Sequence, residues 1–187
     1  MESLGEIAKY LSKEENQVHT LGALLGAGED KSWKVRLAFA KNFSEFTESM
    51  GKEITDNSLI QTFTELLNDT EPEVKHAAIN NISKCLNNLS SEKICNLVLP
   101  TLKDAYADAT PQFKAGAALT LCEMAHMIGK DYTTSQIIPI QLELIKDESS
   151  EVKLNVVQGF MKIARVANVD MLTASLIKTL SEMAKDG

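Results

Sequence analysis

Proline, glycine and aromatic residues are scarce in this chain of 187 residues, with four prolines, nine glycines and 5% aromatics. Few prolines leave long stretches free of helix breakers, and the commonest residues (Ala, Leu, Ile, Lys and Glu) together favour helices. The balance of 44% hydrophobic and 24% charged residues is typical of a folded domain rather than a disordered one. The composition therefore predicts a folded, mainly helical protein.

Positive charge is also scarce, because the net charge is −7 and the only two arginines are Arg36 and Arg165. A protein that binds nucleic acid needs a basic face to displace counterions, and an acidic surface is a poor match for anionic lipid. We therefore expect neither nucleic-acid nor membrane partners.

Signals for secretion, membrane insertion and disulfide formation are missing. Cys85, Cys95 and Cys122 form an odd set without CxxC spacing, which indicates a reducing compartment. The N-terminal stretch lacks the basic and apolar regions of a signal peptide, and no apolar run reaches the ~18 residues that span a bilayer. We expect the protein in the cytoplasm, with the nucleus as a second compartment.

Motifs for chemistry are missing as well. His19, His76 and His126 show no metal-binding spacing such as HExxH, and the chain has no Gly-rich phosphate loop and no GxSxG. We therefore predict no catalytic residue, metal ligand, cofactor or small-molecule substrate, and a protein that is not an enzyme.

The chain repeats itself with a period of 39 residues. Five of its nine aspartates lie at this step, at Asp30, Asp69, Asp108, Asp147 and Asp186. Each of the first four is followed, six residues later, by a basic residue: Arg36, Lys75, Lys114 and Lys153. A fixed period of this length is the mark of a repeat architecture.

Apolar residues keep the same step and place two helices in each repeat. One helix face begins with Leu4, Phe43, Ile82, Leu121 and Phe160, and a second with Leu21, Ile60, Leu99, Ile138 and Ile177. Each set has apolar neighbours three or four residues away, as one face of a helix requires. We place helix A near 14–28, 54–67, 91–106, 132–146 and 170–185, and helix B near 33–50, 72–89, 111–128 and 150–167.

These elements predict an all-α fold, an α-α superhelix in which stacked helix pairs share one core. The single solenoid would comprise a partial helix B at 1–12, repeats at about 13–51, 52–90, 91–129 and 130–168, and a partial repeat at 169–187. We expect a piece of a longer array.

Pro100 and Pro139 should bend helix A at equivalent places. Six methionines are expected to fill gaps in the core: Met50, Met124, Met127, Met161, Met171 and Met183.

A repeat of this length, with a proline in helix A and an Asp-x-x-[Pro]-x-Val-[Arg/Lys] loop, resembles the HEAT family. Three stretches resemble the middle repeats of the scaffolding (A) subunits of type-2A protein phosphatases: DKSWKVR at 30–36, MGKEIT at 50–55 and KDESSEVKLN at 146–155. The resemblance covers roughly residues 30–187, and the glycines at positions 22, 26 and 28 depart from the pattern.

The resemblance implies a HEAT-repeat solenoid that acts as a phosphatase regulator without activity of its own. Such a scaffold holds a catalytic subunit and a regulatory B-type subunit through the loops between helix A and helix B. Another HEAT-repeat solenoid, such as a transport receptor or a coat adaptor, is the alternative, although its repeats usually vary more in length. A helical-repeat glycosylase would need a basic concave surface, and the net charge argues against it.

The repeated aspartates and basic residues are better explained by structure than by catalysis, because a catalytic dyad is not normally present four times. We expect each aspartate to cap the start of helix B and to pair with the basic residue of the next repeat. This ladder would comprise Asp30, Arg36, Asp69, Lys75, Asp108, Lys114, Asp147 and Lys153.

Trp33 is the strongest candidate for a protein contact, since it is the only tryptophan and occupies the loop column of Pro72, Pro111 and Ser150. These types tolerate solvent, which suggests an exposed column, and tryptophan is enriched among residues that dominate binding energy. Its ring could instead fold back onto a neighbouring repeat. The predicted protein-binding residues of these loops are Trp33, Lys34, Pro111, Gln112, Ser150 and Glu151.

Overall fold

The computed structural model describes residues 7, 10–107, 109–167 and 169–183. All regular structure in these residues is helical, with no strand among them, so the all-α prediction is confirmed. The chain divides into two compact units, residues 1–107 and 108–187, which are described separately below. The partial helix B expected at 1–12 falls mostly outside the described residues. Across the described part of the chain, every helix is too short or too polar to cross a bilayer.

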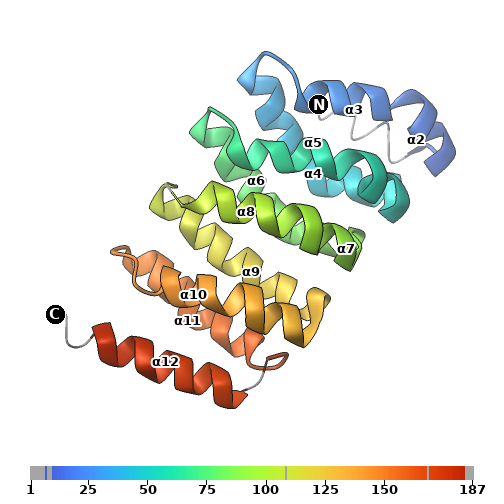
Figure 1. Ribbon diagram of the computed structural model, residues 1–187. Helices are drawn as coiled ribbons and strands as arrows, with labels where there is room; N and C mark the ends of the chain where they lie inside the picture. The colour runs from blue at the N-terminus through green and yellow to red at the C-terminus, as the bar shows by residue number, and fades with distance from the viewer. Residues whose placement is uncertain (1–6, 8–9, 108, 168, 184–187) are drawn as a thin grey trace. The chain divides into compact units, whose positions relative to one another are not determined.

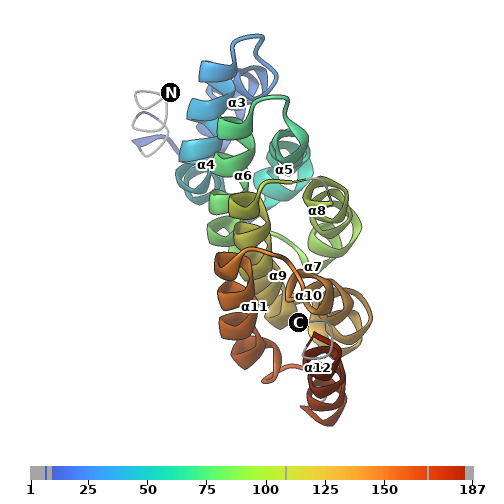
Figure 2. The same cartoon turned by 90° about the vertical axis from the view of Figure 1, so that its left-hand side faces the viewer.

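Unit 1 consists of two layers of helices. Figures 1 and 2 show α4 and α6 in one layer and α3, α5 and α8 in the other. The helical segments are α2 (Lys13–His19), α3 (Leu21–Gly28), α4 (Trp33–Ile54), η1 (Thr55–Leu59), α5 (Ile60–Glu65), η2 (Leu66–Asn68), α6 (Pro72–Cys85), η3 (Leu86–Asn88), α7 (Ser91–Lys93), η4 (Ile94–Val98) and α8 (Leu99–Tyr106). Helix α4 packs on α6, and α3 packs on both α4 and α5.

Unit 2 has the same two-layer arrangement, with α9 beside α11 and α10 beside α12 (Figure 2). Its segments are α9 (Pro111–Tyr132), η5 (Thr133–Ile137), α10 (Ile138–Leu144), α11 (Ser150–Ile163) and α12 (Val169–Met183). The four helices expected near 33, 72, 111 and 150 begin at Trp33, Pro72, Pro111 and Ser150. The two-helix repeat is therefore present in both units.

Glycine and serine share one column of the repeat but shape the junction between two helices in different ways. Ser12 and Ser90 accept the backbone N–H of the residue three positions on, each at 3.2 Å, and so cap helix A. Gly51 and Gly129 have φ values of 77° and 80° and kink the end of helix B. Glycine is favoured there because this backbone conformation strains any residue with a Cβ.

Helix A departs from α geometry at the same place in three repeats, in the π-helical turns η1, η4 and η5. Pro100 and Pro139 lie two residues beyond η4 and η5, close to where a bend was expected. The repeat with η1 has Gln61 at this position, so proline alone does not cause the wider turn.

The core of unit 1 is built around four phenylalanines, all fully buried: Phe39, Phe43, Phe46 and Phe63. The rings of Phe43 and Phe63 stack with their centroids 3.7 Å apart, and this contact joins α4 to α5. Four of the six phenylalanines of the chain therefore lie in one cluster.

The core of unit 2 contains a polar contact that fits a close helix approach. Gln141 stands in an otherwise apolar column, is fully buried, and donates from Nε2 to the carbonyl oxygen of Ala118 at 2.7 Å. The thiol of Cys122 donates to the same oxygen at 3.0 Å, and burial raises its pKa to about 12. A Cβ at Gly159 would overlap the Cys122 sulfur, so α11 lies directly against α9.

Candidate protein-binding loops

The repeated aspartates hold the turn between helix A and helix B. Each accepts, through Oδ1, the backbone N–H two residues later: Asp30 from Ser32 at 2.7 Å, Asp69 from Glu71 at 2.9 Å and Asp147 from Ser149 at 2.9 Å. The donor is the residue that precedes helix B in each case. The aspartate therefore closes a turn in front of the helix, rather than capping the first-turn N–H groups as we expected. Asp108 lies outside the described residues.

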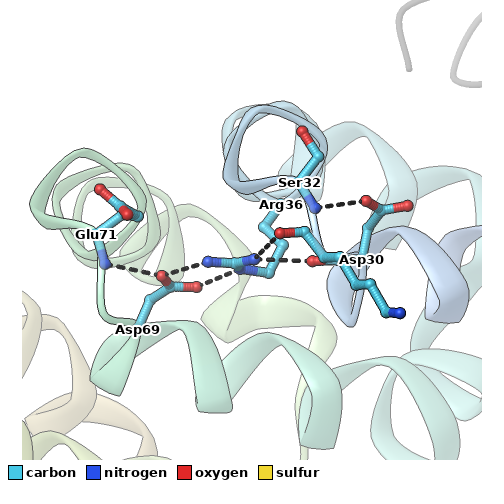
Figure 3. A network of polar contacts seen from close by, with 6 residues as sticks. Asp30, Ser32, Arg36, Asp69 and Glu71 are labelled. Atoms are coloured by element: carbon cyan, nitrogen blue, oxygen red, sulfur yellow. Dashed lines mark hydrogen bonds and ion pairs between the residues drawn. The ribbon is translucent and has the colours of Figure 1, made fainter.

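Arg36 joins two successive loops of unit 1 (Figure 3). Its Nε donates to Asp69 Oδ2 at 2.6 Å and its Nη2 to Asp69 Oδ1 at 2.8 Å, which makes a bidentate ion pair. Its Nη1 donates to the carbonyl oxygens of Asp30 at 2.7 Å and Lys31 at 3.3 Å. The two side chains of the ion pair are 16% and 5% exposed, respectively. One guanidinium group thus holds both loops in a fixed relation.

The equivalent contact in unit 2 is weaker. Lys114 Nζ donates to Asp147 Oδ2 at 3.0 Å, with side-chain exposures of 24% and 15%. An ammonium group is a point charge and does not reproduce the two-point fork of a guanidinium. The partners that this spacing implies for Lys75 and Lys153 are Asp108 and Asp186, and both lie outside the described residues.

The direction of the ladder is opposite to our prediction. We expected each aspartate to pair with the basic residue of the next repeat, but Asp69 and Asp147 pair with that of the preceding repeat. Side chains in the first turn of a helix lean toward its N-terminus, which brings a long basic side chain to the level of the loops. The short carboxylate stays with its own turn, so the basic residue is the one that reaches across.

These contacts shift the ionisation of both carboxyl groups. Burial by itself would raise the pKa of Asp69, but hydrogen bonds from Arg36 and from the Glu71 N–H outweigh it and lower the pKa. The pKa of Asp147 is lowered by the Ser149 N–H and by Lys114. The hydrogen bond to Asp69 raises the pKa of Arg36. Both aspartates are therefore held in the charged form.

Acid should weaken unit 1 through Asp69. The stabilisation from a lowered pKa is fully present above the unfolded pKa of 3.8 and is lost as the pH falls toward the lower folded value. We expect the free energy of unfolding of the wild type and of Asp69→Asn to differ most at neutral pH and to converge as the pH falls below about 4. Urea unfolding of both proteins, followed by Trp33 fluorescence, measures this difference. A difference that stays constant over this range would show that Asp69 does not titrate with folding.

The predicted binding residues lie at the start of helix B. Trp33, Pro111 and Ser150 are the first residues of α4, α9 and α11. Five of the six residues have exposed side chains: Lys34, Pro111, Gln112, Ser150 and Glu151. The turns that precede Trp33 and Ser150 are held by the hydrogen bonds of Asp30 and Asp147, respectively.

Trp33 is only partly exposed, although Pro72, Pro111 and Ser150 of its column are exposed. The Nζ of Lys34 lies 6.0 Å from the centroid of the Trp33 ring, a distance at which a cation is attracted by the ring face. The Trp33 side chain is therefore neither fully exposed nor fully buried, and its role in protein binding stays a prediction.

Two contacts between repeats of unit 1 escaped prediction. Asp56 Oδ1 accepts the backbone N–H of Ser90 at 2.9 Å, and Asn88 Nδ2 donates to Thr47 Oγ1 at 3.0 Å. Asp56 is one of the aspartates outside the 39-residue column, and these polar positions do not repeat. A periodicity search gives no signal for them.

Metal-binding clusters are not found in the part of the chain that the structure describes, where no three His, Cys, Asp or Glu side chains gather. The thiols of Cys85 and Cys122 are buried, and burial raises the pKa of each to about 12. Both thiols are therefore protonated at neutral pH and poorly suited to act as nucleophiles.

Comparison with known proteins supports the repeat assignment for the middle of the chain. Residues 52–129 match the family described as PPP2R1A-like HEAT repeat. None of the curated proteins compared with the chain matches it. HEAT-repeat domains generally mediate protein binding, which agrees with turns that present exposed side chains. Residues 52–129 are therefore a PPP2R1A-like HEAT repeat within an all-α chain of stacked helices.

Proposed function

We propose that this chain is a non-catalytic scaffold that binds the catalytic and regulatory B-type subunits of protein phosphatase 2A through its intra-repeat loops. The observation that carries the proposal is the match of residues 52–129 to a PPP2R1A-like HEAT repeat. The constant 39-residue step extends the same pattern to the Asp30 and Asp147 loops on either side. By this proposal the protein acts in the cytoplasm and the nucleus.

The loops are suited to binding because they are held before a partner arrives. Asp69 is bound by Arg36 and by the Glu71 N–H, and Asp147 by Lys114 and the Ser149 N–H. A loop that is already ordered loses little conformational entropy on association, so more of the contact energy appears as affinity. The ladder residues would thus act indirectly, by positioning Trp33 and Glu151.

The alternative is another protein-binding HEAT solenoid, such as a transport receptor or a coat adaptor. Those proteins usually have repeats of more variable length than the constant step seen here. The two functions differ in their partners, so direct binding to phosphatase subunits separates them.

We expect the purified chain to bind a type-2A regulatory subunit and Trp33→Ala to weaken binding by about 2 kcal/mol or more. The substitution removes the partly exposed indole ring from a loop that hydrogen bonds hold in place. Isothermal titration calorimetry gives the affinity, and circular dichroism checks that helicity is unchanged. Tyr132→Ala is the matched control, because Tyr132 is an exposed aromatic residue outside the A–B loops.

Equal losses for Trp33→Ala and Tyr132→Ala would remove Trp33 from the binding surface and leave the scaffold function standing. A chain that binds neither a regulatory nor a catalytic subunit, yet remains helical, would favour the alternative solenoid function.

A further inference from the structure

A small pocket opens in unit 1 between α2 and the C-terminal end of α4. Its volume is about 200 Å³, with Glu14 and Gln17 of α2 on one side and the turn at Gly51 on the other. Drug-sized ligands occupy pockets of roughly 300–1,000 Å³. The smaller pocket of this chain therefore has room for a single amino-acid side chain from another molecule.

The pocket lies far from the A–B loops. Helix α4 begins at Trp33, beside the Asp30 loop, and the pocket is at the other end of this helix. With a rise of about 1.5 Å per residue, Trp33 and the pocket are roughly 25 Å apart along the helix. A ligand in the pocket would leave the A–B loops free, so a role for the pocket goes beyond the proposed phosphatase-binding function.

The next repeat explains why the pocket stays open. There, Asp56 Oδ1 accepts the backbone N–H of Ser90 at 2.9 Å and joins the two repeats. Gln17 and Gly51 hold the same two positions one repeat earlier, and the exposed Gln17 side chain makes no hydrogen bond to the described residues. Gly51 contributes no side chain, so the space between these two positions is left unfilled.

The exposure of the pocket does not depend on where the sequence begins. Glu53 occupies the position of Glu14 in the next repeat, and both side chains are exposed. Since Glu53 has a repeat on each side of it within unit 1, this position stays open to solvent when repeats pack on both sides.

The floor of the pocket is apolar. Met50 and Ile54 line it and are only 1% and 8% exposed. The prediction that Met50 fills a gap in the core is confirmed, whereas Met161, for which the same was predicted, is 73% exposed, and that prediction was wrong. An aliphatic group that enters the pocket can therefore pack against Met50 and Ile54.

The rim of the pocket is polar and carries more negative than positive charge. Glu14 and Glu53 contribute two carboxylates, and Lys52 contributes one ammonium group. Within the part of the chain that the structure describes, none of these three side chains forms an ion pair. Gln17 and Asn57 add amide oxygens, which accept hydrogen bonds. The rim therefore offers unpaired acceptors to a positively charged donor.

We propose that this pocket binds an arginine side chain of a partner protein. A guanidinium group has five N–H donors and no acceptor, and its planar fork matches carboxylates. Glu14 and Glu53 supply these carboxylates, and the aliphatic stem of the arginine packs on Met50 and Ile54. The arginine belongs to a protein because HEAT-repeat domains generally mediate protein binding, and residues 52–129 match this family.

Nuclear magnetic resonance of the isotope-labelled full chain tests the proposal with N-acetyl-arginine amide as the probe. We expect shift changes of the backbone amides at residues 14–17 and 51–58, with a dissociation constant on the order of 1 mM for a single side chain. N-acetyl-citrulline amide has the same shape without the charge and should bind at least about tenfold more weakly. N-acetyl-lysine amide should also bind more weakly, because an ammonium group lacks the fork.

Variants of the rim locate the site. Glu14→Gln and Glu53→Gln should each weaken binding of the arginine probe about two- to fivefold, the range of an exposed ion pair. Lys52→Glu should tighten binding, because it replaces the one base of the rim by an acid. Glu92→Gln is the matched control, since Glu92 is exposed at the same position of the repeat but does not line the pocket.

The proposal fails if the shift changes spread evenly over the acidic surface, or if Glu53→Gln and Glu92→Gln weaken binding equally. Equal affinity for the arginine and citrulline probes would overturn the role of the carboxylates. Equal affinity for the arginine and lysine probes would overturn recognition of the guanidinium group. No phosphatase subunit takes part in these measurements, so their failure would leave the proposed scaffold function untouched.

Discussion

Phe43→Ala should lower the free energy of unfolding of the protein by about 3–5 kcal/mol, the usual cost of removing a fully buried phenylalanine from a core. Phe43 has no exposed surface, stacks on Phe63 at 3.7 Å and contacts the ring of Phe39 at 5.5 Å. Alanine would leave a cavity between α4 and α5, and the surrounding phenylalanines are too large to close it fully. Urea unfolding followed by Trp33 fluorescence measures the loss, because Trp33 is the first residue of α4.

Phe43→Leu is the control for this prediction. Leucine keeps most of the apolar volume but not the ring contact, so it should cost less than alanine. A loss below about 1 kcal/mol for Phe43→Ala would mean that the cluster rearranges to fill the space. Helices α4 and α5 would then be able to repack around the smaller side chain.

Arg36→Ala should lower the free energy of unfolding by about 3 kcal/mol, because it leaves a nearly buried carboxylate without its ionic partner. Asp69 would keep the hydrogen bonds from the Glu71 N–H and the Thr70 side chain but lose its only ion pair with Arg36, and the carbonyl oxygens of Asp30 and Lys31 would lose the Arg36 donor. The two loops that Arg36 joins should become more mobile as well. Hydrogen exchange of the amides of residues 30–32 and 69–71 measures this second effect.

Two further variants serve as comparisons for the stability loss expected of Arg36→Ala. Lys114→Ala should cost only about 1 kcal/mol or less, since this more exposed pair has a single hydrogen bond. Arg36→Lys should recover only part of the loss, because an ammonium group cannot make the bidentate contact and reach the loop carbonyls together. Equal costs for Arg36→Ala and Lys114→Ala would contradict the stronger role assigned to Arg36.

The periodic part of the fold could be predicted because one physical requirement is repeated along the chain. Each helix pair needs an apolar face toward its neighbours, so the columns of Phe43 and Ile60 recur every 39 residues. The starts of helix B at Trp33, Pro72, Pro111 and Ser150 follow from the same register. Residues that do not repeat, such as Asp56 and Asn88, gave no such signal, and their contacts appeared only in the structure.

The sequence predicted the positions of the candidate loop residues better than it predicted the exposure of their side chains. The register placed Lys34, Pro111 and Glu151 beside the turn, and their side chains are exposed. Trp33 has the same register and is nevertheless half-buried, since exposure depends on which neighbour a side chain leans against. The sequence alone does not show which neighbour a side chain packs against, because that depends on how the helices are arranged in the tertiary structure.

By itself, the sequence determined the repeat length, the two helices in each repeat and the positions of the loop residues. These properties depend on local hydrophobic spacing and on turn-forming residues, which act within one repeat. Only the tertiary structure decided that Asp69 pairs backward with Arg36, that Gly159 lies against Cys122 and that Met161 is left exposed. Each of these depends on how far and in which direction one helix pair is displaced from the next, and a period counted along the chain does not encode that displacement.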